Sequence, residues 1–150
     1  MEIERKFLLK TIPDGLYTRP CHHIEQGYLC TDPVVRIRKA DDNYYLTYKG
    51  KGKMAREEHN LPLNEASYIH LREKIDGVLI RKSRYLVPIH DGLTAEVDVF
   101  IAPNNGLHLA EVEFDSMEQA LSFVPPEWFG EDVTQDGRYH NSHMSGLSTE

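Results

Sequence analysis

Several segments of this chain alternate charged and apolar residues, so that charged side chains recur at every second position. The first segment places Glu2, Glu4 and Lys6 at such positions, with Ile3 and Phe7 out of phase with them. Because successive side chains of a strand point to opposite faces, the three charged residues would share one face. Two carboxylates at this spacing can bind a hard divalent cation, and the adjacent lysine can bind an anion. The alternation therefore predicts a sheet in which one face of each strand is charged.

The charges are segregated by sign from one segment to the next. Like charges at neighbouring positions on one face repel each other, and a sheet with its charged face in water is expected to mix the signs. A closed sheet with a charged interior explains the segregation better, because acidic residues would hold cations there and basic residues would hold a polyanion. A solvated sheet face is the alternative. The acidic pairs are Glu2/Glu4, Glu96/Asp98 and Glu111/Glu113, and the basic pairs are Arg36/Arg38 and Lys82/Arg84.

The period-two pattern also predicts where the strands lie. β-Branched and aromatic residues fill most of the apolar positions, as is typical of strands. A barrel of about eight strands has an interior just wide enough for one small ligand. We therefore expect an α+β fold: an eight-stranded antiparallel β-barrel with a charged interior and helices packed on its outside. The predicted strands lie near residues 1–9, 24–30, 34–40, 43–50, 54–62, 79–88, 93–101 and 107–115.

Capping residues and apolar spacing predict the helices. Asn64 would cap a first helix over residues 64–76, which Gly77 ends. Ser116 would cap a second helix that ends before Pro125, and Asp136 would cap a short third helix over residues 138–147. Laid on the outside of the barrel, helices would bury the outward apolar residues of the strands. Their own buried sides would be Ala66, Ile69, Leu71 and Ile75 in the first helix, and Met117, Ala120, Leu121 and Phe123 in the second.

Length and composition restrict the classes of protein. A chain of 150 residues, 40% of them hydrophobic, is expected to form one domain over residues 1–150. Its net charge of −7 argues against nucleic acid as a partner. No apolar run approaches membrane-spanning length and no signal segment precedes the first strand, so we expect no membrane association and a cytoplasmic location. Cys21 and Cys30 match no metal or redox motif and are expected to be free thiols.

In their order along the chain, these motifs resemble the CYTH superfamily, also called the triphosphate tunnel metalloenzymes. Its hallmark is an N-terminal E-x-E-x-K, which stands here at residues 2–6. The likeness extends over essentially the whole chain, and one departure is Gly137, where some relatives carry a lysine. The other matching motifs are R-x-R at Arg36 and Arg38, T-x-K at Thr47 and Lys49, K-x-R-Y at residues 82–85, E-x-D at Glu96 and Asp98, E-x-E at Glu111 and Glu113, and the run from Trp128 to Thr134 followed by Asp136, Arg138, Tyr139 and Asn141.

The resemblance implies an eight-stranded antiparallel tunnel that binds a linear triphosphate together with a divalent metal. Activities of the family are inorganic triphosphatase, thiamine triphosphatase, class IV adenylyl cyclase and RNA triphosphatase. Because few loop residues are left over to build a nucleoside or thiamine pocket, we expect a hydrolase that cleaves inorganic triphosphate to pyrophosphate and phosphate. A class IV cyclase, a triphosphatase acting on thiamine or nucleoside triphosphates, and a non-catalytic binder of polyphosphate or nucleotide are the alternatives.

Each charged residue then receives an expected role. A small-molecule triphosphate is the expected partner, with a homodimer left open, and Mg²⁺ or Mn²⁺ is the expected cofactor. A metal-activated water would attack the terminal phosphorus in line. The expected metal ligands are Glu2, Glu4, Asp98, Glu111 and Glu113, which with Lys6 make up the expected catalytic set. The expected substrate-binding residues are Lys6, Arg36, Arg38, Lys49, Arg56, Lys82 and Arg84.

Overall fold

The computed structural model describes residues 1–147, which form a ten-stranded sheet with a few short helices. No helix among these residues is long and apolar enough to cross a membrane. The strands are β1 (Glu2–Leu9), β2 (Cys21–Thr31), β3 (Val34–Ala40), β4 (Asn43–Lys49), β5 (Ala55–Arg56), β6 (Glu58–Leu63), β7 (Asp76–Pro88), β8 (Thr94–Ala102), β9 (His108–Glu113) and β10 (Phe129–Asp132). The helices are α1 (Glu65–Arg72) and α2 (Met117–Ser122), and the shorter helical turns are η1 (Leu16–Thr18), η2 (His90–Gly92), η3 (Gly137–Tyr139) and η4 (His143–Leu147).

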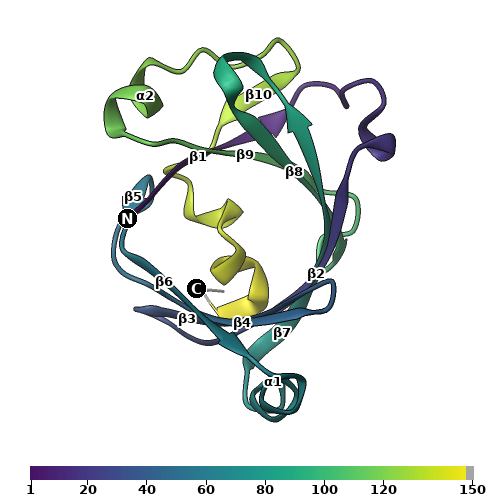
Figure 1. Ribbon diagram of the computed structural model, residues 1–150, viewed down its shortest axis with the longest axis vertical. Coiled ribbons are helices and arrows are strands. Elements are labelled where there is room, and N and C mark those ends of the chain that lie inside the picture. Colours follow the sequence, from purple (N-terminus) through teal and green to yellow (C-terminus); the bar gives the residue numbers. More distant parts are fainter. Residues whose placement is uncertain (148–150) are drawn as a thin grey trace.

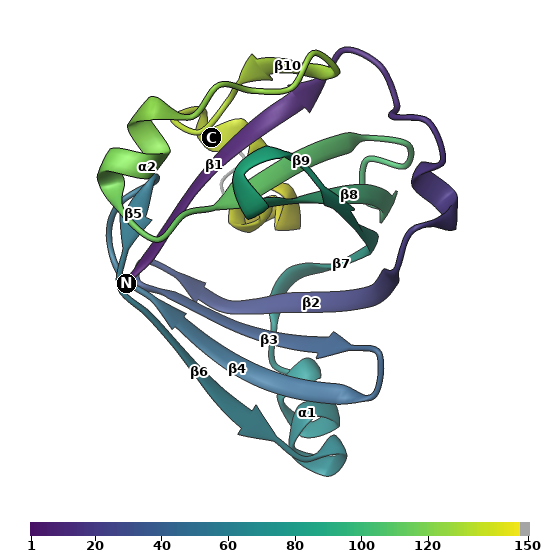
Figure 2. The same ribbon diagram turned by 45° about the horizontal axis from the view of Figure 1, so that its top comes forward.

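The strands form one antiparallel sheet that curls into a nearly closed barrel (Figures 1 and 2). Along the sheet the order is β10-β1-β9-β8-β7-β2-β3-β4-β6, and β5 pairs with β1, with Glu2 opposite Arg56. Only Glu57 separates β5 from β6, so the strand that pairs with β4 also closes the ring against β1. The predicted antiparallel β-barrel is confirmed. The strand count exceeds eight because the predicted strand over 54–62 is broken in two and because β10, which was not predicted, adds to the edge of β1.

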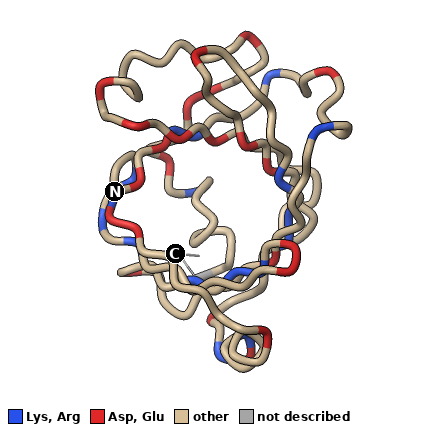
Figure 3. The backbone as a smooth tube through the Cα atoms, in the orientation of Figure 1, with Lys and Arg blue, Asp and Glu red and all other residues tan. Residues whose placement is uncertain are grey.

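The charged faces of the strands point into the barrel. Between β1 and β9, Glu4 lies opposite Glu113 and Lys6 lies opposite Glu111. Figure 3 shows charged residues of both signs distributed along the wall of the ring. Glu4, Lys6 and Glu111 are each at most 8% exposed, so these residues do not form a solvated sheet face.

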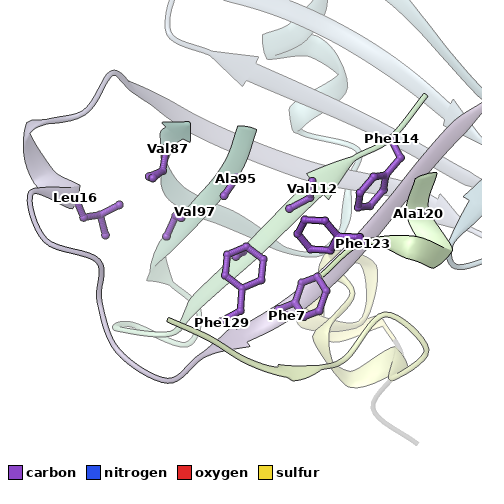
Figure 4. Close-up of a cluster of buried hydrophobic side chains, with 11 residues drawn as sticks. Phe7, Leu16, Val87, Ala95, Val97, Val112, Phe114, Ala120, Phe123 and Phe129 are labelled. Carbon is purple, nitrogen blue, oxygen red and sulfur yellow. The ribbon is translucent and has the colours of Figure 1, made fainter. Parts of the chain in front are cut away.

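The outward faces of β1, β8 and β9 carry a hydrophobic core that lies outside the barrel wall (Figure 4). Phe123, which directly follows α2, packs among Phe7, Phe114 and Phe129. The distances from its ring centroid to theirs are 5.9, 5.2 and 6.1 Å respectively. Val112 of β9 belongs to the same cluster, as the alternation predicts. The expected burial of outward apolar strand residues is therefore confirmed on this side of the barrel.

The N-terminal cap of α2 is confirmed, but part of its predicted buried side is wrong. Ser116 accepts a hydrogen bond from the Gln119 amide, and Ala120 is fully buried. Met117 and Leu121 are 40% and 68% exposed instead. A helix of six residues offers only a narrow contact to the barrel, and Phe123, in the extended segment that follows, is buried in the same cluster as Ala120.

The first helix, α1, packs outside β3 and β4 and is shorter than predicted. Asn64 caps it as expected by accepting a hydrogen bond from the Ser67 amide, but the helix ends at Arg72 and not at residue 76. The chain leaves the helix there and brings Ile75 against Gly27 of β2. A Cβ on Gly27 would lie 2.8 Å from Cγ2 of Ile75, so this close approach requires glycine.

The buried residue of α1 is Tyr68, which was not predicted. Its hydroxyl donates a hydrogen bond to the Glu25 carboxylate on β2 at 2.8 Å, whereas Ala66 and Ile69 are exposed. A tyrosine can bury its ring while its hydroxyl finds a polar partner. The apolar stripe Ala66, Ile69, Leu71 and Ile75 is therefore wrong as the buried side of this helix.

The C-terminal segment, residues 133–147, crosses one end of the barrel (Figure 1). The predicted continuous helix over 138–147 is wrong, because His140 has an extended backbone that separates η3 from η4. At this end the inward strand positions are apolar: Ile80, Phe100 and Leu109 form a buried cluster with Met144 of η4. The segment thus covers the end of the barrel at which the charged faces of the strands become hydrophobic.

Replacing Phe123 by alanine is expected to lower the free energy of unfolding by about 3–5 kcal/mol, because the outer core would lose a ring and keep a cavity. Urea denaturation followed by circular dichroism measures the change. Leu121→Ala, two residues earlier and 68% exposed, is the matched control and should change stability by less than about 0.5 kcal/mol. Equal losses in the two variants would contradict this description of the core.

Candidate active site

The barrel encloses a cavity of about 220 Å³ whose wall is almost wholly charged and polar. All the residues predicted for the site line this cavity except Asp98. The structure therefore brings together residues that are more than a hundred positions apart in the sequence, such as Glu2 and Glu113. The lining residues are Glu2, Glu4, Lys6, Tyr28, Val34, Arg36, Arg38, Lys49, Arg56, Glu58, Asn60, Lys82, Arg84, Glu96, Glu111, Glu113, His140, Asn141 and Ser142.

On one side of the cavity, basic residues of β4 and β5 hold Glu2. Lys49 Nζ donates to both carboxylate oxygens of Glu2, at 3.0 and 3.2 Å, and Arg56 Nε lies 3.6 Å from Oε1. Burial by itself would raise the pKa of Glu2, but the Lys49 ammonium outweighs this effect and the pKa is lowered. Glu2 is therefore an ionised carboxylate with its counter-charge already in place.

A second network joins β1, β7, β8 and β9. Asp98 accepts hydrogen bonds from Arg84 Nε and Nη2 at 2.8 and 3.0 Å, and Lys82 Nζ lies 2.7 Å from its Oδ2. Glu111 is paired with Lys6 at 3.1 Å and with Arg84 at 3.2 Å. Burial opposes ionisation of both acids, but the basic partners outweigh it and lower the pKa of Asp98 and of Glu111. These acids are also ionised and paired.

The position of Asp98 does not fit the metal-ligating role expected for it. Its side chain is 1% exposed, and it is not among the residues that line the cavity. Both of its oxygens face Arg84 and Lys82 on the neighbouring strand β7. The alternation correctly placed Asp98 on the inward face, but the two basic neighbours occupy its oxygens. Asp98 is suited to orienting Lys82 and Arg84 toward the cavity.

Glu4 and Glu113 form no ion pair within residues 1–147, although they lie opposite each other on β1 and β9. Burial, followed by the charges of Glu111 and Glu2, raises the pKa of Glu4 to about 8. Burial, followed by the charges of Glu96 and Glu2, raises the pKa of Glu113 to about 7. We call Glu4 and Glu113 the acidic pole. A cation between them would favour their ionised forms and so offset the burial and the repulsion that raise their pKa values.

Arg36 and Arg38 of β3 have no carboxylate partner in the part of the chain that the structure describes. Arg36 Nη2 donates to the Thr47 hydroxyl at 3.2 Å, while its Nε is buried without a hydrogen bond. Arg38 Nε donates to Gln26 Oε1 at 2.8 Å. Burial, followed by the charges of Arg36 and Arg84, lowers the pKa of Arg38 to about 9. We call Arg36 and Arg38 the basic pole, and it lacks an anion.

The two poles face each other across the cavity. Three strands separate β9 from β3 in each direction around the ring. They are β8, β7 and β2 on one side, and β1, the β5–β6 strand and β4 on the other. The strand with the basic pole is therefore opposite the strand that carries Glu113. A ligand that fills the space between them has to present positive charge to one wall and negative charge to the other. A polyanion that carries a divalent cation has this property.

The donor set of the cavity fits a divalent cation that completes its coordination with phosphate oxygens and water. Within residues 1–147, no three His, Cys, Asp or Glu side chains are placed to hold an ion by themselves. Mg²⁺ usually binds through one or two carboxylates together with substrate phosphates, and not in an all-protein cage. Glu4 and Glu113 supply such a pair, whereas Glu2 and Glu111 are already held by lysines.

The structure adds residues that the sequence did not single out. Gln26 is fully buried between Arg38 and the C-terminal segment. Asn60 lines the cavity and accepts a hydrogen bond from Thr47 at 2.6 Å. The period-two spacing of Asn60 from Arg56 was a signal that could have found it. Residues 140–142 carry no strand pattern, so the alternation did not indicate that they would reach the cavity.

Comparisons with known proteins agree on one family. The model of the CYTH domain matches residues 1–135. The chain is 40% identical to the inorganic triphosphatase of Nitrosomonas europaea over 96% of each chain, and 37% identical to that of Acetivibrio thermocellus over 95% of this chain and 92% of the relative. A crystal structure of an inorganic triphosphatase matches 97% of this chain and 94% of its own, with 37% identity and a TM-score of 0.68. The chain therefore belongs to the CYTH domain family.

Proposed function

We propose that this protein is a metal-dependent triphosphatase that cleaves inorganic triphosphate to pyrophosphate and phosphate. The observation that carries the proposal is the pair of opposed poles: Glu4 and Glu113 lack a cation, and Arg36 and Arg38 lack an anion. A linear triphosphate with bound Mg²⁺ or Mn²⁺ supplies both charges in one ligand. The two relatives that match nearly the full chain are named inorganic triphosphatases, which supports the same activity here.

The basic residues would bind and neutralise the phosphoryl oxygens. Arg36 and Arg38 present planar guanidinium groups that can bind two oxygens each, whereas Lys6 and Lys49 act as point charges. When held at Glu4 and Glu113, a divalent cation supplies Lewis-acid chemistry and lowers the pKa of a bound water. No covalent nucleophile is needed, because catalysis of phosphoryl transfer rests mainly on positioning and on charge neutralisation.

The lining of the cavity favours an inorganic substrate over a nucleotide. Among the lining residues that the structure describes, only Tyr28, Val34 and His140 carry an aromatic or aliphatic side chain. Nucleobases usually bind by stacking on aromatic side chains or by packing in apolar pockets. The ring of thiamine has the same requirement. The cavity offers little surface of this kind, so cyclase, thiamine triphosphatase and nucleoside triphosphatase activities are less well supported.

A phosphate-release panel tests the proposal. Tripolyphosphate, ATP, thiamine triphosphate and pyrophosphate are each incubated with the protein in the presence of Mg²⁺ or Mn²⁺ and after chelation. Tripolyphosphate should be hydrolysed fastest, and only with metal. Release of cyclic AMP from ATP as the main product would favour a cyclase. Tight binding of triphosphate without turnover in either metal would favour a non-catalytic binder and would overturn the proposal.

Glu4→Gln is expected to abolish metal-dependent hydrolysis while the fold is retained, because glutamine keeps the size of the side chain and removes its charge. Turnover should fall by at least about a hundredfold, the range typical of losing one electrostatic contact to the transition state. Glu57→Gln is the matched control, since Glu57 follows β5 and its side chain is 60% exposed. Wild-type turnover in Glu4→Gln would reject the acidic pole as the cation site.

The raised pKa of Glu4 predicts a pH dependence of stability in the metal-free protein. The raised pKa keeps a proton on Glu4 in the folded state up to about pH 8, whereas the unfolded chain releases it near the ordinary glutamate pKa of 4.5. Stability therefore falls as pH rises between these two values, and Glu4→Gln removes this decline. At pH 8 and without metal, the variant should be more stable than wild type by about 1 kcal/mol or more. Urea denaturation at several pH values measures the free energy of unfolding of both proteins. The same pH dependence in wild type and Glu4→Gln would contradict the raised pKa of Glu4.

Arg36→Lys is expected to raise the KM for tripolyphosphate by about tenfold or more, because a lysine keeps the charge but loses the two-point contact to phosphate oxygens. Steady-state kinetics at saturating metal measures the change. Arg81→Lys is the control, because the Arg81 side chain is 57% exposed and pairs with Glu25. An unchanged KM in Arg36→Lys would show that Arg36 does not bind substrate.

A further inference from the structure

The C-terminal segment supplies part of the wall of the cavity, although most of it lies beyond residue 135, where the family match ends. Lys6 Nζ donates a hydrogen bond to the Tyr139 carbonyl at 3.0 Å. Lys82 Nζ donates to Asn141 Oδ1 at 3.0 Å. Two lysines expected to bind phosphate are thus held in place by a segment outside the strands. Of this segment, His140, Asn141 and Ser142 line the cavity.

A chain of hydrogen bonds fixes the orientation of the Asn141 amide. Arg38 can only donate, so the oxygen of Gln26 must face Arg38 Nε, which lies 2.8 Å away. The Gln26 nitrogen then faces Asn141 at 3.3 Å. A lysine ammonium also only donates, and Lys82 Nζ lies 3.0 Å from the same atom of Asn141. Both donors therefore require Oδ1 of Asn141 at this position.

This orientation leaves the nitrogen of Asn141 available to a ligand. Oδ1 accepts from Lys82 and from Gln26, which uses both of its lone pairs. Nδ2 makes no hydrogen bond to any residue within 1–147, although Asn141 lines the cavity. Nδ2 of Asn141 thus adds an uncharged hydrogen-bond donor beside the positive charge of Lys82. An anion with several acceptor oxygens is the ligand that such a cluster would recognise.

Asn141 also lies at the covered end of the cavity. Beyond it the inward faces of the strands carry Phe100 and Leu109, which pack with Met144 of the same C-terminal segment. A linear phosphate chain cannot continue through this apolar layer, because burying a charged group there without a partner is costly. A chain that enters the cavity must therefore end near Asn141, with one unsubstituted terminal group.

We propose that Asn141 recognises the terminal phosphoryl group of the substrate: Nδ2 donates to a phosphoryl oxygen while Oδ1 holds Lys82 and Gln26. The inference rests on the proposed function in so far as the substrate is a linear phosphoanhydride with a free end. Asn141 is then both a substrate-binding residue and the residue that positions Lys82. The C-terminal segment becomes a functional part of the site, although it has none of the strand motifs that mark the other residues.

Two substitutions separate the nitrogen of Asn141 from its oxygen. Asn141→Asp keeps an acceptor oxygen for Lys82 and Gln26 but places a negative oxygen where the nitrogen was. Asn141→Ala removes both functions. Binding of tripolyphosphate is measured by calorimetry without divalent metal, alongside hydrolysis with metal and thermal unfolding. His143→Ala is the control, because His143 is in the same segment and does not line the cavity.

Asn141→Ala should weaken tripolyphosphate binding by about tenfold, as for the loss of one hydrogen bond to a charged group. Asn141→Asp should weaken it by about a hundredfold, because repulsion is added to the lost donor. A purely structural asparagine predicts the opposite order, since aspartate would hold Lys82 at least as well. Binding by Asn141→Asp within twofold of wild type would overturn the inference.

The outcomes distinguish this inference from the proposed function. If the wild-type protein binds tripolyphosphate but does not hydrolyse it, the proposed function fails, and the order of the two variants in binding still decides the role of Asn141. If the wild type hydrolyses tripolyphosphate and Asn141→Asp keeps its KM and kcat, only the inference about Asn141 fails. If the wild type does not bind the anion, both fail.

Discussion

The burial of like charges inside a β-barrel is the constraint on which the rest of this structure depends. Moving an ion from water into a protein interior costs several kcal/mol even after relaxation, and only well-placed counter-charges offset this cost. Inside the barrel, Lys49 pairs with Glu2 and Lys82 with Asp98. Glu4 has no such partner in the described part of the chain, nor have Arg36 and Arg38, so burial disfavours the charged form of Glu4 and leaves the two arginines without a counter-charge in the empty site. A metal-bound polyanion would offset the cost at both poles at once. The electrostatic cost that destabilises the empty protein therefore favours binding of this ligand.

A barrel with a charged interior has to find its hydrophobic stabilisation elsewhere. Small barrels commonly fill their interior with side chains, but here many inward positions are charged. The larger of the two apolar clusters lies outside the wall, where Phe123 packs on the outward residues of β1 and β9. The same strands contribute to both the outer core and the cavity. On β9, Val112 belongs to the outer core while Glu111 and Glu113 face the cavity. Residues that stabilise the fold and residues that bind the ligand thus alternate along one strand. A shift of register by one residue would move each set to the opposite face.

The alternation in the sequence predicted most of the strands, their charged faces and most of the charged residues of the cavity wall, because side-chain direction in a strand depends only on whether a position is odd or even. The position of a residue along its strand does not predict which side chains of neighbouring strands it contacts. Asp98 was therefore correctly placed on the inward face, but the alternation could not show that its oxygens face Lys82 and Arg84 on the neighbouring strand. Asn141 could not be placed at all, because its position depends on the path of an irregular segment. Tyr68 was missed because hydropathy does not register a ring that is buried while its hydroxyl is bonded.

The inward face of each strand also changes character along its length, and this order has a consequence for the route of the substrate. On β1 the inward residues are Glu2, Glu4, Lys6 and Leu8, and on β9 they are Glu113, Glu111 and Leu109. Acidic residues therefore lie toward the end opposite the C-terminal segment, and apolar residues lie toward the covered end. When Glu4 and Glu113 are ionised, a bare polyanion that approaches from this end meets their like charge, whereas the same anion with a bound divalent cation brings the ion that these two carboxylates lack. The order of residues along each strand thus favours entry of the metal complex over entry of the free anion.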